Sequence, residues 1–292
     1  MTDSVELVID AGATLAEGPV WDIAAQRLYW VDILEHRVHT FDPQHGTQQV
    51  FDIGQYVGAA VPRRSGGLIL AIQHGFAHLD LASGTITQLV DVEADLPDNR
   101  FNDGKCDPAG RFWAGTMSLS GRQGAGSLYR FDPDQTVHRM VSDVSISNGL
   151  AWKSDLTTMY YIDTPTLTVT ALDYDHARGA VANRRVVITI PDGQGGPDGM
   201  TIDAEGMLWV AHWGGSCVTR WDPAQGRLLQ QFDIPAAQVT SCCFGGPGLD
   251  ELYITTASYG LSAEARAAQP AAGGIFRVRP GVQGLPADSY AG

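Results

Sequence analysis

The feature that most constrains the fold of this chain is a repeat of about 45 residues. A short apolar segment recurs six times in the 292 residues, as RLYWVD, GLILAI, RFWAGT, TMYYID, MLWVAH and ELYITT, centred near Leu28, Leu68, Phe112, Met159, Leu208 and Leu252. Successive copies are 40, 44, 47, 49 and 44 residues apart. Repeats of this length, each supplying four short antiparallel strands, are typical of the blades of a β-propeller.

The sequence around these segments repeats as well. Several copies are followed by a second strand that ends in an aromatic residue and an acid, as in VHTFDP, SLYRFDP, VTALDYD and VTRWDP. Two copies are preceded by the turns DPAG at 107–110 and DAEG at 203–206, where glycine supplies the positive φ of a tight turn. We therefore predict an all-β chain, folded as one six-bladed β-propeller domain over residues 1–292.

Two segments fall outside the repeat. We expect a strand at Glu6–Ile9 to complete the last blade and close the ring, and LSAEARAAQPAAG at 261–273 to form a helical insertion in that blade. The competing architecture is a two-sheet sandwich, which would need turn signals every 8 to 12 residues without the longer repeat. The longer repeat favours the propeller.

Charge and hydropathy narrow the range of partners. The formal net charge is −14 and the only lysines are Lys105 and Lys153, so there is no basic stripe for nucleic acid. No run of 18 apolar residues exists, and the N-terminus lacks a basic start and an apolar stretch, which predicts no membrane association and a cytoplasmic protein. The expected partner is a small neutral molecule, and the expected assembly is a monomer or small homo-oligomer.

The four cysteines do not have the spacing of a metal site. Cys106, Cys217, Cys242 and Cys243 include no CxxC pair, and no second pair is available to complete a zinc knuckle. We interpret them as reduced, semi-buried residues rather than as disulfides or soft-metal ligands.

Oxygen-bearing side chains recur at one offset in the repeat. Ten or eleven positions before four of the apolar segments stand Glu17, Asn102, Asn148 and Asp198. The other two repeats have Val57–Gly58 and Ser241–Cys242 there. Each oxygen lies close to a glycine, so we expect the backbone to bend sharply where the oxygen points toward the axis.

Singly, such residues are Asx-turns or strand-end caps. Together at one end of a propeller axis, two carboxylates and two amides would be costly to bury without a partner. Oxygen donors suit a hard or borderline divalent cation, such as Ca²⁺, Mg²⁺, Mn²⁺, Zn²⁺ or Fe(II).

Motifs in five of the repeats carry a family resemblance. The strings LAEGPVW, RFNDGK, GTM, GSLYRFDP, SNGLAW, PDGM with LWVAHWGG, and CCFGG with LYITTA resemble the SMP-30/gluconolactonase/LRE family in order and spacing. The resemblance implies a metal-dependent sugar lactonase with Glu17, Asn148 and Asp198 as metal ligands and with Arg100 and Asn102 as substrate contacts. It also implies Asp198 as general base.

Asp103, beside Asn102, is a second candidate for the base. Animal members of the family carry an acidic residue just after the GTM string, whereas this chain has Ser118. His212 either faces the pocket or caps a strand end, and Trp213 and Tyr259 are candidates to stack on a sugar ring.

The reaction expected from these features is hydrolysis of an aldonolactone, such as a xylono-, arabinono- or gluconolactone, to the free sugar acid. Two alternatives remain open at the level of sequence. One is a metal-dependent esterase of the paraoxonase or organophosphatase kind, and the other is a propeller that binds metal without catalysis.

Overall fold

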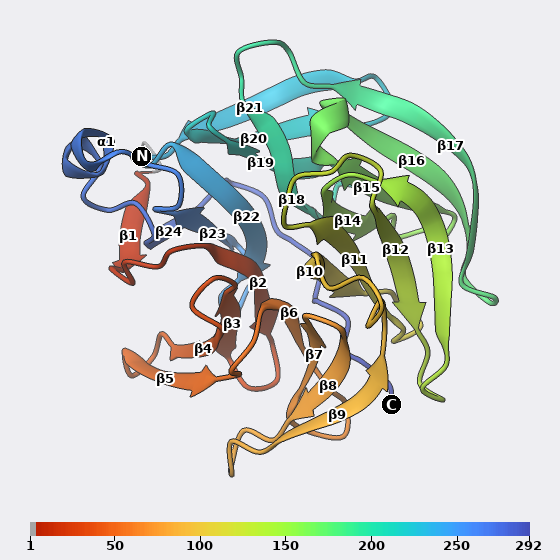
Figure 1. The fold of residues 1–292 in the computed structure, drawn as a ribbon. Coiled ribbons are helices and arrows are strands. Elements are labelled where there is room, and N and C mark those ends of the chain that lie inside the picture. Colours follow the sequence, from red (N-terminus) through yellow and green to blue (C-terminus); the bar gives the residue numbers. More distant parts are fainter. Residues whose placement is uncertain (1–3) are drawn as a thin grey trace.

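Each predicted repeat corresponds to antiparallel strands of one sheet (Figure 1). The computed structural model describes residues 4–292, which form an all-β protein with sheets arranged radially around a centre, as in a β-propeller. Four sheets have four strands each. They are β2–β5 (Ala16–Asp22, Arg27–Asp32, Arg37–Asp42, Thr47–Asp52), β6–β9 (Val57–Pro62, Leu68–Ile72, Gly75–Leu79, Ile86–Asp91), β10–β13 (Asn99–Cys106, Phe112–Ser118, Gly126–Phe131, Val137–Val144) and β14–β17 (Ser147–Trp152, Thr158–Asp163, Thr168–Asp175, Ala180–Thr189).

The remaining strands form an eight-stranded sheet with two halves. One half contains β18 (Gly196–Ile202), β19 (Leu208–Trp213), β20 (Cys217–Asp222) and β21 (Arg227–Asp233), and the other contains β22 (Gln238–Gly245), β23 (Glu251–Ala257), β24 (Ile275–Val278) and β1 (Glu6–Ile9). The pairing between the halves is a single residue pair, Trp213 with Gln238. Strand β1 pairs antiparallel with β24, so the predicted N-terminal strand does complete the last sheet.

The recurring apolar segments become the second strands of their sheets, namely β3, β7, β11, β15, β19 and β23. These strands read as nearly continuous apolar runs because both of their faces are packed, and Trp30, Trp113 and Trp209 are fully buried in them. The first strands lie at the centre, where β2 contacts β6 and β22, β14 contacts β10 and β18, β6 contacts β10, and β18 contacts β22. Residues on these first strands therefore share one central axis.

The predictions for the turn glycines and for the helical insertion are confirmed. Gly110 and Gly206 have φ of +81° and +82° in their turns. Helix α1 (Ala263–Ala268) lies between β23 and β24, and the Ser262 side chain caps it by accepting a hydrogen bond from the Ala265 amide. All four cysteines are buried and free. In the described part of the chain, no helix is both long enough and apolar enough to cross a membrane.

Candidate metal centre and active site

Every first strand is irregular at the position where the sequence places the recurring oxygens. The pairing of β2 with β3 shifts between Glu17 and Val20, and β6, β10, β14, β18 and β22 have register shifts at the equivalent place. A β-bulge leaves residues unpaired and re-aims side chains, and bulges are frequent beside active sites. Asn102 and Asp198 fall inside the bulges and have no partner across the sheet. Glu17 and Asn148 are the last paired residues before the bulges. All four oxygens therefore lie where the regular pairing is interrupted.

The glycines beside these oxygens have a different role from the predicted one. Of Gly18, Gly104, Gly149 and Gly199, only Gly18 has a positive φ, +52°. A Cβ on Gly149 would lie 2.9 Å from the Asp198 carbonyl oxygen, and a Cβ on Gly199 would meet the Ser241 side chain. A positive φ is therefore absent at three of the four, although each of these strands carries a bulge at this place. Gly149 and Gly199 instead allow neighbouring first strands to approach closely, whereas a Cβ on Gly104 would meet β11 of its own sheet.

The carboxylates of the ring form a crowded, buried cluster. Burial raises the pKa of Glu17 well above its ordinary value, and the charges of Asp198 and Asp103 raise it further. Burial, followed by the charge of Asp103, raises the pKa of Asp198 in the same way. Arg100 partly offsets both effects. The structure thus brings Glu17, Asp103, Asp198 and Arg100 together, and a further positive charge would stabilise this cluster.

Two oxygens of the ring have no partner. Oδ1 of Asn148 and Oδ1 of Asp198 are both buried and accept no hydrogen bond from the protein. Buried acceptors are normally paired, so unpaired ones at a site of negative charge fit a bound cation. Between residues 4 and 292, no cluster of three His, Cys, Asp or Glu side chains could hold a metal ion. The candidate donor set of Glu17, Asn148 and Asp198 contains two such side chains and one amide, and all its donor atoms are oxygens that suit a hard cation.

Arg100 and Asn102, the predicted substrate contacts, are hydrogen-bonded to each other and to backbone carbonyls. The Arg100 guanidinium donates from Nη1 to the Phe101 carbonyl (2.9 Å) and to Oδ1 of Asn102 (2.8 Å), while its buried Nε donates to nothing. Nδ2 of Asn102 donates to the Ser147 carbonyl at 2.9 Å. Both ends of the Asn102 amide are therefore occupied within the protein, and this residue fixes the position of Arg100.

Comparison with known proteins places this geometry in a family. The SMP-30/Gluconolactonase/LRE-like region matches residues 15–258. The chain belongs to the SMP-30/gluconolactonase/LRE family. It is 43% identical over 291 residues to regucalcin of Danio rerio, with 99% of this chain and 98% of the relative covered. It is 41% identical over 286 residues to the putative sugar lactone lactonase YvrE of Bacillus subtilis (strain 168), with 98% of each covered.

Among solved structures, this family member is similar to the calcium-binding protein regucalcin from Agrobacterium tumefaciens, with a TM-score of 0.94 at 30% sequence identity. The match covers 99% of this chain and 97% of the other. The predicted family membership is therefore confirmed, and the sheets and their order are those of the family fold.

The position after the GTM string differs from the acidic residue of the family's animal members. The Ser118 side chain is buried, and its hydroxyl donates to Oδ2 of Asp98 at 2.8 Å. Ser120 bonds the same carboxylate oxygen. The Ser118 hydroxyl is thus hydrogen-bonded to Asp98.

Of the residues left open by the sequence, His212 has a structural role. It is fully buried, and Nδ1 lies 3.0 Å from the Gln194 carbonyl while Nε2 lies 2.6 Å from the Thr219 hydroxyl. A carbonyl only accepts, so Nδ1 carries the proton and Nε2 accepts. Burial lowers the pKa of His212 to about 4. Both nitrogens are occupied in a neutral ring, so His212 does not face the pocket.

One of the aromatic candidates, Tyr259, lies close to Arg100. Trp213 and Tyr259 have ring centroids 6.5 Å apart, and 54% of Tyr259 is exposed. Tyr259 and Tyr56 both oppose the burial-driven lowering of the pKa of Arg100, which is about 10. Sequence reasoning missed Tyr56, because it falls outside the repeated strings. An exposed aromatic face beside a buried guanidinium can accept a polar ring with apolar faces.

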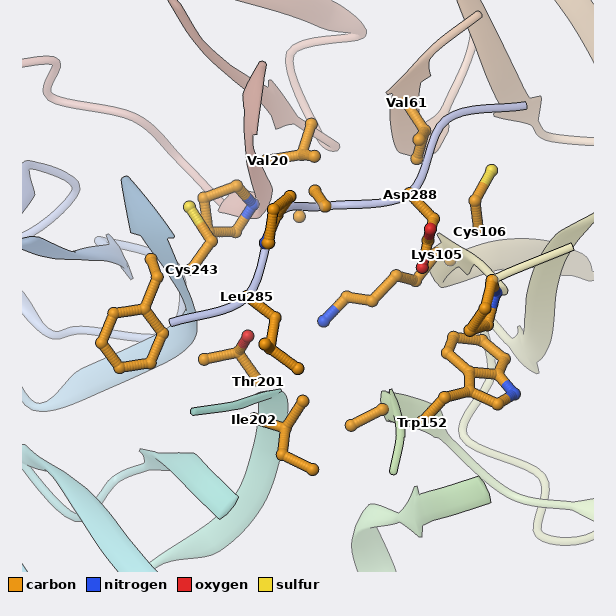
Figure 2. A pocket seen from close by; sticks show the side chains of 18 of the residues that line it. Val20, Val61, Lys105, Cys106, Trp152, Thr201, Ile202, Cys243, Leu285 and Asp288 are labelled. Carbon is orange, nitrogen blue, oxygen red and sulfur yellow. The ribbon is translucent and has the colours of Figure 1, made fainter. Parts of the chain in front are cut away.

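A cavity of about 140 Å³ lies at the other end of the first strands (Figure 2). Its lining includes Val61, Trp152 and Ile202, from the final residues of β6, β14 and β18, and it is crossed by the C-terminal segment 285–288. Figure 2 shows the Lys105 ammonium pointing into it. This group donates to the Met200 carbonyl at 2.7 Å, across the axis from β10. Lys105 therefore lies on the cavity side of Asp103. After Arg100, it is the second positively charged side chain near the axis.

Proposed function

We propose that this chain hydrolyses an aldonolactone to the free sugar acid, with a divalent cation held by Glu17, Asn148 and Asp198. The observation that carries the proposal is the pair of unpartnered buried oxygens, Oδ1 of Asn148 and Oδ1 of Asp198, beside the buried Glu17 carboxylate. Membership of a family whose relatives include a putative sugar lactone lactonase supports the choice of reaction.

The proposed scaffold is a single six-bladed propeller domain. The six first strands contact one another in a closed circuit, and the two halves of the eight-stranded sheet share one residue pair only. Counting those halves as two blades gives six, and pairing of β1 with β24 joins the first and the last strand of the chain in the last blade. Closure of this kind removes the exposed sheet edges at the centre.

When bound, a divalent cation polarises the lactone carbonyl and lowers the pKa of water. The identity proposed for it is Ca²⁺, Zn²⁺, Mn²⁺, Mg²⁺ or Fe(II), and the name of the calcium-binding Agrobacterium relative favours testing Ca²⁺ first. This chain's own residues bind and orient the substrate. Nη2 of Arg100 makes no hydrogen bond within the described residues and, unlike Nε, is not fully buried, so it is the donor available to a ring hydroxyl, and Asn102 holds the guanidinium in place.

The proton acceptor is proposed to be one of two carboxylates. Asp198 is the candidate implied by the family, but a carboxylate committed to a cation is a weaker base. Asp103 is the alternative. Its Oδ1 accepts from the Gly104 amide at 2.7 Å, and the Lys105 ammonium opposes the burial that raises its pKa. Lys105 therefore favours the ionised form of Asp103, which is the form that accepts a proton.

A lactone panel with defined metals tests this proposal. We expect the purified protein to open five- and six-carbon aldonolactones faster than a no-enzyme blank, and a chelator to abolish the excess rate. Turnover of a phosphotriester faster than any aldonolactone would assign the chain to the esterase alternative. Absence of turnover on every substrate would leave a binding protein.

The Arg100→Ala variant tests the sugar contact. A site that hydrogen-bonds substrate hydroxyls loses discrimination when the donor is removed. We expect kcat/KM to fall by roughly tenfold to a hundredfold for an aldonolactone, as for loss of one or two hydrogen bonds to a charged group, and far less for an unsubstituted lactone. Equal losses on both substrates would show that Arg100 does not bind the sugar.

A further inference from the structure

Asn148 is the only amide in the proposed donor set. An amide side chain can bind a cation through its oxygen but not through its NH₂ group. Turned one way it presents Oδ1 to the ring, and turned the other way it presents an NH₂ group, which repels a cation. A carboxylate such as Asp198 has no such choice. The protein must therefore contain a group that selects the orientation of Asn148.

That group is the Thr164 hydroxyl. Nδ2 of Asn148 donates to Oγ1 of Thr164 at 2.9 Å, and Oγ1 of Thr164 donates to the Pro197 carbonyl at 2.8 Å. A carbonyl oxygen only accepts, so the single hydrogen of the hydroxyl points at Pro197. The hydroxyl then faces Asn148 with a lone pair, and only the NH₂ side of the amide can meet it. Oδ1 is left facing the ring, where it is buried and unpartnered.

Thr164 is held firmly enough to act in this way. It begins the 3₁₀-helix Thr164–Thr166 after β15, and its own amide donates to the Ile146 carbonyl at 3.1 Å. The preceding Asp163 carboxylate accepts from the amides of Ser145 and Ile146, which lead into β14 and Asn148. A Cβ on Gly196 would lie 3.0 Å from the Thr164 methyl, so the chain leaves room for that methyl group on β18. The hydroxyl thus connects β14 to β18 beside the ring.

We propose that Thr164 is a positioning residue that selects the oxygen-inward orientation of Asn148 and so sets the affinity of the site for a divalent cation. This inference rests on the proposed metal site. Groups that orient metal ligands typically contribute tenfold to a hundredfold to metal affinity. The Asn148 side chain also hydrogen-bonds the Asp198 carboxylate. Because that carboxylate would itself hold the cation, the Thr164 hydroxyl is the selecting group that is independent of the metal.

The test measures binding of Mn²⁺ or Ca²⁺ alone by isothermal titration calorimetry, on metal-free full-length protein. Thr164→Val keeps the shape of the side chain, and we expect it to weaken binding at least about tenfold. Thr164→Ser keeps the hydroxyl and should remain within about twofold of the original chain. Thr166→Val is the matched control, since its hydroxyl lies on the same 3₁₀-helix but donates to the Asp163 carbonyl. It should bind metal like the original chain.

The same substitution in an Asn148→Asp protein distinguishes loss of the amide orientation from a general loosening of the site. In Asn148→Asp the donor is a carboxylate, which needs no selection of face, so adding Thr164→Val should then change metal affinity by less than about twofold. Equal losses in both backgrounds would show a merely structural role and overturn the inference. Wild-type affinity in Thr164→Val, or loss in Thr164→Ser, would overturn it as well. If the original chain binds neither ion, the proposed metal site itself is refuted. That result differs from all the others, which require metal binding by the original chain.

Discussion

The Asp198→Asn substitution should raise stability without metal and lose that advantage when metal is bound. The channel contains three buried carboxylates, on Glu17, Asp103 and Asp198, against the two cations Arg100 and Lys105. When all are ionised, one negative charge is in excess in a poorly solvated site. Asn has the shape of Asp without the charge, so the substitution should relieve repulsion in the metal-free protein by about 1–3 kcal/mol.

The size of the effect on melting follows from the chain length. An unfolding entropy of about 2.1 cal/mol/K per residue gives about 0.6 kcal/mol/K for 292 residues. In chelator, Asp198→Asn should therefore melt about 2–5 °C above the original chain. A cation at a hundred times its Kd stabilises the original chain by about 2.7 kcal/mol, which is about 4–5 °C. The variant should show no such gain, so the order of melting temperatures is reversed or equalised in metal.

The assay is differential scanning calorimetry at pH 8, in chelator and in excess Ca²⁺ or Mn²⁺. Asp107→Asn is the matched control, because the buried Asp107 carboxylate accepts from the Arg111 and Trp113 side chains at 2.7 and 2.9 Å. Breaking this satisfied pair should destabilise the protein by about 3–5 kcal/mol in both conditions. An Asp198→Asn variant that melts below the original chain in chelator would refute the argument, since its carboxylate would then be stabilising rather than strained.

Two further predictions concern packing and pH. Gly199→Ala should cost about 1–3 kcal/mol in urea unfolding, because the new Cβ meets the Ser241 side chain and lies 2.8 Å from its Cα; adding Ser241→Gly should recover part of the loss. A neutral effect of Gly199→Ala alone would contradict the close approach of β18 and β22. Burial, then the charge of Asp107, raises the pKa of Asp288 to about 6, so ionisation of Asp288 opposes folding. The stability of the protein with Asp288 protonated is fully present below the unfolded pKa near 4, and part of it is lost as the pH rises through about 6. Asp288→Asn should therefore raise the melting temperature at pH 8 and leave it nearly unchanged at pH 4. The exposed Asp192→Asn, which removes the same charge, is the control, and a gain at pH 4 as large as at pH 8 would contradict the cause given.

The sequence by itself determined the strands and their grouping. Apolar segments such as RLYWVD and TMYYID recur at a nearly fixed distance, and they became the fully packed second strands of their sheets because the signal is local. The same repeat located Glu17, Asn102, Asn148 and Asp198 on the central strands, since equal offsets in equivalent sheets place residues around one axis. The Ser262 cap and the turn glycines were equally local features.

The tertiary structure alone decided what each side chain does. Asn102 turned out to be occupied by Arg100 and the Ser147 carbonyl, and His212 by Gln194 and Thr219. Lys105 reaches across the axis to Met200, 95 positions later in the chain. The contacts of Asn102 with Ser147 and of Lys105 with Met200 join different sheets, and those of His212 join different strands of one sheet or its entry loop, so the repeat pattern alone does not encode them. The orientation of the Asn148 amide has the same origin, because it depends on a hydroxyl 16 residues away whose hydrogen is committed to a third strand. Periodicity places a residue on the axis, but the direction of its hydrogen bonds is fixed only when the neighbouring strands are in place.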